Sequence, residues 1–212
     1  MIIKAATIIS LAAAVSAAPA GAAKSDIEAR GTQSDAGPGP GPFSFLALRS
    51  ASPIHFGSLN ASGLKIWIGK PTESYCPVDP KFCPPGNVTA FFVDNTASMS
   101  VSVPGGQQVY IDPKGALSYT QAHSAAIPPG SITTCFRVMN SPNDNNILFF
   151  SNGEGDFVAC PVAPETGPYQ VFVNIKGGLK SEDVPSGNTA DCLGFTAAGG
   201  PAQEQVSAWQ YT

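Results

Sequence analysis

The chain has 212 residues and a net charge of −4 at neutral pH, and 43% of its residues are hydrophobic. That hydrophobic fraction excludes a disordered chain, because enough apolar surface is present to offset the entropy of ordering, and the acidic balance gives no support for binding nucleic acid or anionic membranes. Only 12% of the residues are charged, whereas 22 are glycine and 20 are proline, a composition typical of a turn-rich β protein.

Residues 1–17 have the pattern of a secretory signal peptide. Lys4 provides a short positive region, residues 5–15 are apolar, and Val15–Ala17 has the small residues of a signal-peptidase site. A membrane anchor is the alternative, but this apolar stretch is shorter than the roughly 20 residues that span a bilayer. No apolar run of that length follows. We therefore expect cleavage after Ala17 and a secreted, extracellular protein without a membrane segment.

Residues 18–42 are a leader rich in glycine and proline, which alternate over 37–42. Such a segment is flexible and cannot pack a core, so we expect the leader to be disordered. It is either a pro-segment removed near Arg30 or a linker that stays attached. Residues 43–212 remain as a single β domain, a length that suits one hydrophobic core.

Short apolar runs with period-two alternation predict the strands of this domain. In chain order they are 43–48, 64–68, 90–93, 99–103, 108–111, 117–120, 133–138, 147–150, 157–160, 169–175 and 193–197. No window repeats apolar residues at the helical spacing, so we expect little helix. Short strands separated by turns are typical of a β-sandwich or a closed β-barrel. We predict an all-β fold of one of these two kinds, with antiparallel strands and stabilising disulfides.

Several neighbouring runs are predicted to form hairpins. The apolar runs of residues 147–161 flank Asn152-Gly153, the dipeptide that best suits a tight turn with positive φ. We predict a hairpin there, ending where Pro161 follows Cys160. Residues 91–103 and 136–150 are two further hairpins, each with a polar turn.

The five cysteines are expected to form disulfides, because the secretory route is oxidising. We predict a Cys160–Cys192 bond across the sheet and a Cys76–Cys83 bond that closes a Pro-rich loop. Cys135 is then the odd cysteine, either free or paired between chains. A zinc site is the alternative use, but no cysteine pair has the close spacing of zinc ligands. We predict no metal site and no other cofactor.

No motif in the sequence has the pattern of a catalytic site. The Gly-x-Ser-x-Gly elbow of serine hydrolases is absent, and both histidines, His55 and His123, lie in loop-like segments where we expect them to be exposed. A glycosidase needs two carboxylates across a cleft. The candidates for such a pair are Glu73, Glu154, Asp156 and Glu165. Glu154 and Asp156 fall in a predicted turn, where carboxylates commonly serve local hydrogen bonding. We predict that the protein is not an enzyme.

Two sequons, Asn60-Ala61-Ser62 and Asn87-Val88-Thr89, predict N-glycosylation at Asn60 and Asn87. Aromatic side chains are candidates for contacts with sugar rings, because they offer flat apolar faces at little entropic cost. They are Trp67, Tyr75, Tyr110, Tyr119, Tyr169 and Trp209. We expect Trp67 to be in the core. Trp209, near the polar C-terminus, and Tyr110 are the predicted glycan contacts.

The order of several short motifs resembles one protein family. They are Gln108–Asp112 with Gly115–Thr120, then Leu148 with Phe150, Asp156–Pro161, and Asn188–Cys192 with Gly194 and Phe195. Together they resemble the fungal secreted cell-wall proteins typified by the phialide-development protein PhiA and its IgE-binding allergen relatives. The resemblance covers residues 88–198.

The resemblance implies a non-enzymatic, glycosylated protein of the hyphal and spore wall that is linked to asexual development (conidiation). It implies that Cys160 and Cys192 are structural and that no residue is catalytic. The partners would be wall polysaccharide or wall proteins, in an oligomeric state that stays open. The family tends to end in Cys-x-Tyr, whereas residues 208–211 here lack that cysteine. A secreted effector that binds a host protein or glycan, and a polysaccharide-active enzyme, are the alternatives.

Overall fold

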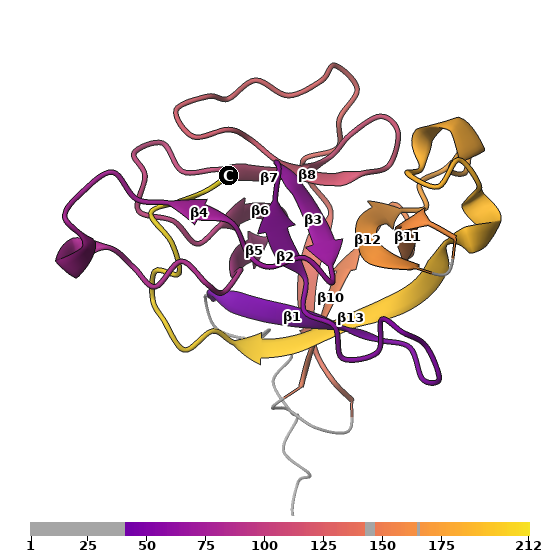
Figure 1. Ribbon diagram of the computed structural model, residues 1–212, viewed down its shortest axis with the longest axis horizontal. Coiled ribbons are helices and arrows are strands. Elements are labelled where there is room, and N and C mark those ends of the chain that lie inside the picture. The colour runs from indigo at the N-terminus through magenta and orange to yellow at the C-terminus, as the bar shows by residue number, and fades with distance from the viewer. Residues whose placement is uncertain (1–40, 143–146, 165) are drawn as a thin grey trace, which may run out of the picture. The chain divides into compact units, whose positions relative to one another are not determined.

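Residues 41–142, 147–164 and 166–212 are described by the computed structural model of the protein (Figure 1). The predicted signal peptide, all but the last two residues of the leader, and Glu165 lie outside the described residues.

The described residues form strands, turns and three short 3₁₀ helices. The strands are β1 (Phe43–Leu48), β2 (Asn60–Ser62), β3 (Lys65–Ile68), β4 (Ser74–Tyr75), β5 (Phe91–Asp94), β6 (Thr96–Met99), β7 (Gln108–Ile111), β8 (Leu117–Tyr119), β9 (Phe136–Asn140), β10 (Leu148–Asn152), β11 (Phe157–Ala163), β12 (Thr166–Val173), β13 (Leu193–Pro201) and β14 (Gln210–Tyr211). The 3₁₀ helices are η1 (Pro80–Phe82), η2 (Ser181–Asp183) and η3 (Thr189–Asp191). The prediction of an all-β fold is confirmed. Within the described part of the chain, no helix has the length and apolar character needed to cross a membrane.

Twelve of the strands form one sheet that closes on itself. The order β1-β5-β6-β7-β8-β3-β12-β11-β13 returns to its start, because β13 pairs with β1 from Phe43 opposite Pro201 to Leu48 opposite Thr196. Figure 1 shows these two strands side by side. β10 and β9 continue from β13, and β2 adds to β3, while β4 and β14 form a separate small sheet. We predicted either a β-sandwich or a closed β-barrel, and the strand pairing is that of a closed β-barrel.

The core lies inside this ring. It consists of side chains from strands in which buried and exposed residues alternate, as the sequence predicts. In β1, Phe43, Phe45 and Ala47 are buried, and the residues between them are partly exposed. β13 passes so close to β1 that a Cβ on Gly199 would overlap the carbonyl oxygen of Ser44. A glycine at this position therefore lets the two strands that close the ring approach each other.

Phe150 of β10 lies at the centre of a cluster of phenylalanine rings. Its ring centroid is 4.7 Å from that of Phe45 in β1 and 5.2 Å from that of Phe157 in β11. The rings of Phe91 in β5 and Phe136 in β9 lie 5.9 and 6.0 Å away. One buried side chain thus contacts strands from distant parts of the sequence.

The predicted hairpin over residues 147–161 is wrong. β10 pairs with β9 and β13, and β11 pairs with β12 and β13, so the two strands follow one another along the same edge of β13. Between them, only an isolated bridge joins Asn152 to Gly155, and neither Asn152 nor Gly153 has the positive φ of a type I′ turn. Because β13 is nine residues long, it pairs with both β10 and β11. A turn motif in the sequence gives no information about such a distant strand.

The other two predicted hairpins are confirmed, with shifted bounds. β5 pairs with β6 and β9 pairs with β10, both antiparallel. The return strand of the first hairpin is 96–99 instead of 99–103, because the chain already reverses at Asn95, whose φ is 55°. Asparagine tolerates this left-handed conformation better than most residues do.

The C-terminal residues pack into one end of the barrel. Tyr211 is buried, and its hydroxyl donates a hydrogen bond to the carbonyl oxygen of Val88 at 2.8 Å. The buried amide of Gln107 accepts from the N–H of Tyr211 at 2.8 Å and donates to its carbonyl oxygen at 2.9 Å. β14 is thereby held by the Gln107 side chain as well as by its short pairing with β4.

Replacing Phe150 by alanine is expected to lower the free energy of unfolding by about 3–5 kcal/mol, because the deletion leaves a cavity among four rings. Urea unfolding of the secreted protein measures the loss. Phe149→Ala is the matched control, since Phe149 is only partly buried on the other face of β10. Equal losses in the two variants would contradict the central role of Phe150.

Alkaline pH is expected to destabilise the fold through Tyr211. Burial raises its pKa from 10.0 to about 12, so the folded state keeps a proton that the unfolded state releases. The stabilisation is complete below pH of about 10 and is lost as the pH rises through about 12. Melting temperatures measured across this range should fall, and less steeply in Tyr211→Phe. A tyrosine that ionises at its ordinary pKa without any loss of stability would refute the assignment.

Candidate functional site

The two histidines considered for catalysis make local contacts only. Nδ1 of His55 accepts a hydrogen bond from the N–H of Arg49 at 3.1 Å, and its ring lies 3.9 Å from that of Phe56. These contacts organise the loop between β1 and β2. His123 is exposed in a loop, with a φ of 61°. Neither has a hydrogen bond or ion pair to a carboxylate among the described residues.

The described candidate carboxylates, Glu73, Glu154 and Asp156, are exposed, and no ion pair or hydrogen bond joins any two of them. The turn that holds two of them is explained by Asn152, whose Oδ1 accepts a hydrogen bond from the N–H of Glu154 at 2.9 Å. This is the local turn chemistry expected from the sequence. Among the described residues, no group of three or more His, Cys, Asp or Glu side chains is placed to hold a metal ion.

The Cys160–Cys192 disulfide fastens a long excursion of the chain to the barrel. Cys160 lies in β11 and Cys192 follows η3, 32 residues later. Beneath the excursion, Ala116, Phe172 and Val184 form a second small core with the buried Cys160. The disulfide therefore closes a separate layer outside the ring of strands.

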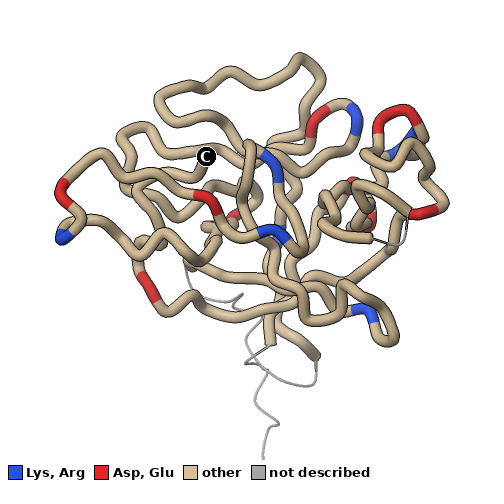
Figure 2. Tube along the Cα trace, viewed as in Figure 1, with Lys and Arg blue, Asp and Glu red and all other residues tan. Residues whose placement is uncertain are grey.

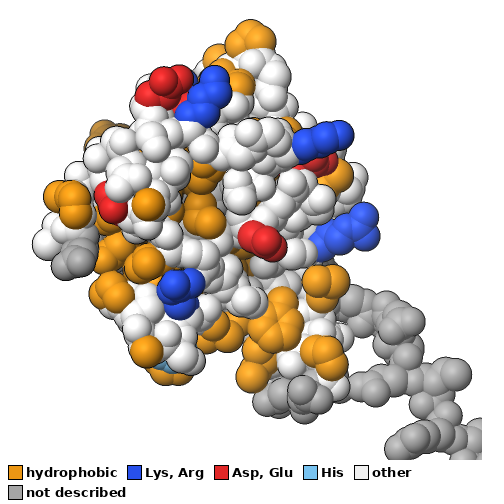
Figure 3. Space-filling view, turned by 90° about the vertical axis from the view of Figure 1, so that its right-hand side faces the viewer, with side chains coloured by type: hydrophobic (Ala, Val, Ile, Leu, Met, Phe, Trp, Pro, Cys, Tyr) orange, Lys and Arg blue, Asp and Glu red, His pale blue; other side chains and the backbone are white. Residues whose placement is uncertain are grey.

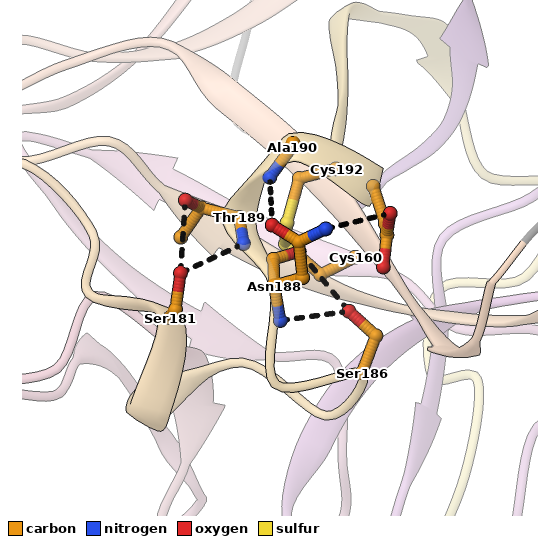
Figure 4. The surroundings of a disulfide bond; sticks show 8 residues. Cys160, Ser181, Ser186, Asn188, Thr189, Ala190 and Cys192 are labelled. Atoms are coloured by element: carbon orange, nitrogen blue, oxygen red, sulfur yellow. Dashed lines mark hydrogen bonds between the residues drawn. A yellow bond between two sulfur atoms is a disulfide. The ribbon is translucent and has the colours of Figure 1, made fainter.

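Asn188 orders the turn that presents Cys192 (Figure 4). Its Oδ1 accepts from the N–H of Ala190 at 3.0 Å, and its Nδ2 donates to Oδ1 of Asp191 at 3.2 Å. This is a capped 3₁₀ turn. The Asn-Thr-x-Asp-Cys motif, which carried part of the resemblance, has a structural role: it directs a cysteine toward β11.

The second disulfide joins Cys76 and Cys83 across a short loop, and these are the two pairs that the sequence analysis predicted. Cys135 has no disulfide partner and is partly buried. Its N–H donates to Oδ1 of Asn95 at 3.3 Å, and its carbonyl oxygen accepts from the N–H of Gly153 at 3.0 Å. Its backbone thus links the β5–β6 turn to the segment between β10 and β11.

The aromatic side chains considered as sugar contacts differ widely in their exposure to solvent. Tyr110 is only 8% exposed, so the prediction that it contacts glycan is corrected: no ring face is available. Alternation misled here, because β7 is buried on both faces at Val109, Tyr110 and Ile111. Trp209 is partly buried beside the β4–β14 pair, and Tyr75 is 55% exposed. The expectation that Trp67 lies in the core is wrong: it is partly buried on the outer face of β3, where Nζ of Lys70 lies 3.7 Å from its ring centroid.

Tyr75 belongs to a projecting segment that we call the aromatic loop, residues 74–83 (Figure 1, the segment with β4 and η1). It also carries Phe82, which is 71% exposed, and the exposed Val78. The Cys76–Cys83 disulfide closes the loop, and Oδ1 of Asp79 caps η1 by accepting from the N–H of Lys81 at 3.1 Å. Rigid exposed rings of this kind lose little entropy when they bind a partner.

Charge on the aromatic loop is balanced. Nζ of Lys81 lies 3.3 Å from Oδ2 of Asp79 and 4.8 Å from the centroid of the Phe82 ring. Figure 2 shows one acidic and one basic residue next to each other at the tip of this loop, and Figure 3 shows another side of the molecule, where acidic and basic side chains also lie side by side. The loop is therefore suited to an uncharged partner with apolar faces.

The sequence analysis missed both strongly exposed phenylalanines, because it considered only Trp and Tyr as ring platforms. The sequence could have indicated that Phe82 is exposed. It follows Pro77 and Pro80 and precedes Cys83, and a segment with these residues does not form an alternating strand. Phe56 is 66% exposed and has a φ of 60°, a conformation that costs a non-glycine residue about 1–2 kcal/mol. This strained backbone conformation of Phe56 could not be recognised from the sequence.

Removing each disulfide is expected to have unequal effects. In the chain-entropy account, the Cys160–Cys192 bond, with a separation of 32 residues, contributes about 4 kcal/mol, and the Cys76–Cys83 bond, with a separation of 7, about 2.5 kcal/mol. Urea unfolding of the two double-alanine variants compares them directly. A larger loss from opening the shorter loop would show that the aromatic loop, and not the second core, supports the barrel.

Comparison with known proteins places the chain in a family. The family model for PhiA-like secreted proteins matches residues 43–212. An uncharacterized secreted protein of Arthroderma benhamiae is 42% identical over 160 residues, which covers 73% of this chain and 77% of that protein. No solved structure matches the chain.

The family match spans every strand described above, including the β11 cysteine and the Asn188 turn that holds its partner. The chain therefore belongs to the family of PhiA-like secreted proteins.

Proposed function

We propose that the protein is a non-enzymatic component of the fungal cell wall that contacts wall polysaccharide through the aromatic loop and acts in the wall during asexual development. Membership of a family of secreted fungal proteins supports the extracellular setting. The wall, the polysaccharide and the developmental role are the steps that experiment has to test.

One observation carries the polysaccharide contact: Phe82 is 71% exposed on a loop that a disulfide holds in shape. No residue of η1 is buried, so the core gives no reason for a phenylalanine there. The C–H faces of hexose rings stack on such side chains, and the balanced charge of Asp79 and Lys81 suits a neutral glycan.

Retention of the purified protein on insoluble wall β-glucan and on chitin tests the proposal. Phe82→Ala is expected to weaken retention about twofold to twelvefold, the equivalent of one aromatic contact of about 0.5–1.5 kcal/mol, and Tyr75→Ala to have a similar effect. Phe92→Ala is the matched control, because it removes an exposed ring from β5, outside the aromatic loop. Equal retention of all variants would reject the aromatic loop as the contact.

Fractionation of a producing culture tests the wall role. We expect the protein in the wall fraction, and gene loss should alter the spore-forming cells. Full recovery in the medium, with binding to host proteins or glycans, would instead support the effector alternative. Turnover in a broad glycan screen that is abolished by changing Glu73, Glu154, Asp156 or Glu165 would show that the protein is an enzyme.

A further inference from the structure

A groove of about 550 Å³ runs beside β1 and β13. Much of its lining is apolar, and three of these side chains, Phe56, Val88 and Ile147, are exposed to solvent. Hydroxyl-bearing residues also line it: Ser44, Ser58 and Thr89. A groove that combines apolar and hydroxyl groups matches the surface of a pyranose ring, which has C–H faces and hydroxyl edges.

Both predicted glycosylation sites, Asn60 and Asn87, line this groove. The fold treats their side chains differently. Asn60 is partly buried in β2, where its Nδ2 donates to the carbonyl oxygen of Lys70 at 2.6 Å and its Oδ1 accepts from the hydroxyl of Thr72 at 3.2 Å. A sugar on Nδ2 of Asn60 would have to share space with the segment that these two bonds hold.

Asn87 is exposed, and its side chain makes no hydrogen bond within the described residues. It lines the groove and also an adjoining pocket of about 540 Å³, bordered by Pro85, Pro201 and Glu204. A group attached to Nδ2 of Asn87 therefore has room on both sides. The neighbouring sequon residue Val88 offers an exposed apolar side chain directly beside the attachment point.

We propose that Asn87, and not Asn60, carries an N-linked glycan, and that its first sugars lie in the groove and cover the apolar side chains there. In the transfer, Nδ2 of Asn87 forms a bond to C1 of the oligosaccharide as the C1–O bond to a lipid diphosphate breaks. The lipid diphosphate leaves and Nδ2 loses one proton. Tethering keeps the sugars at a high local concentration over the groove, which favours even weak contacts.

The structure also indicates that glycan transfer comes before the folding of this region. The hydroxyl of Thr89, which the sequon requires, is buried in the folded protein and accepts a hydrogen bond from the N–H of Ala61 at 2.8 Å. Transfer therefore precedes the closing of this region. A glycan on Asn87 finds room when the groove forms, whereas one on Asn60 would have to displace the segment that Lys70 and Thr72 hold. The inference does not depend on the polysaccharide contact proposed for the aromatic loop, which uses other residues.

Intact-mass and glycopeptide analysis of the full chain, secreted from a fungal host, tests the site. Asn87→Gln is expected to remove the entire glycan mass, whereas the matched variant Asn60→Gln leaves it unchanged. Loss of glycan mass in Asn60→Gln, or an unmodified wild-type protein, would overturn the assignment. Glycopeptides of the wild-type protein give the same answer where a variant is not secreted.

Binding of an apolar fluorescent dye tests the covering of the groove. Enzymatic release of the glycan from the folded wild-type protein should raise the dye signal at least twofold, and Ile147→Ser, which leaves both sequons intact, should reduce that gain. An unchanged signal after release would show that the glycan extends into solvent. Retention on wall polysaccharide is a separate measurement. If the protein does not bind polysaccharide, the glycan mass and the dye signal still test this inference.

Discussion

The burial of the Phe150 ring is the interaction on which the rest of the structure depends. It contacts rings from four strands, and two of these, β1 and β11, pair with β13, the strand that closes the sheet. Aromatic rings bury a large area each, so this cluster holds together segments that are distant in sequence. Because the ring of strands is closed, few backbone groups at its edges are left to pair with other chains.

Outside the barrel, disulfide bonds supplement or replace core packing. The excursion between β12 and β13 has a small core of its own and is fastened by Cys160–Cys192. The aromatic loop has no core and is closed by Cys76–Cys83. A disulfide chiefly limits the freedom of the unfolded chain, so it can hold a loop whose apolar side chains face solvent. This division lets the protein expose Phe82 without the loop collapsing onto the barrel.

Local pattern predicted the strands well where one face of a strand is buried. The bounds of β1 agree with the structure to the residue, and the phenylalanines that end up in the core were all in predicted strands. Pattern failed where the partner is distant. Asn152-Gly153 suits a turn, yet the long edge of β13 pairs with both flanking strands. β7 is buried on both faces, so Tyr110 is covered although it lies opposite the core residues Val109 and Ile111.

The sequence by itself determined the secreted class, the all-β fold and the two sequons, because each follows from composition or from short local patterns. The cysteine pairs were a prediction that only the structure could decide, since Cys160 and Cys192 are 32 residues apart. Only the tertiary structure decided which of these features face solvent. Asn60 and Asn87 have the same local motif, but Lys70 and Thr72 hold the Asn60 side chain, whereas the Asn87 side chain is exposed and makes no hydrogen bond to the part of the chain that the structure describes. Exposure is a property of packing between distant segments, and for that reason Asn87 became distinguishable from Asn60 only in the folded chain.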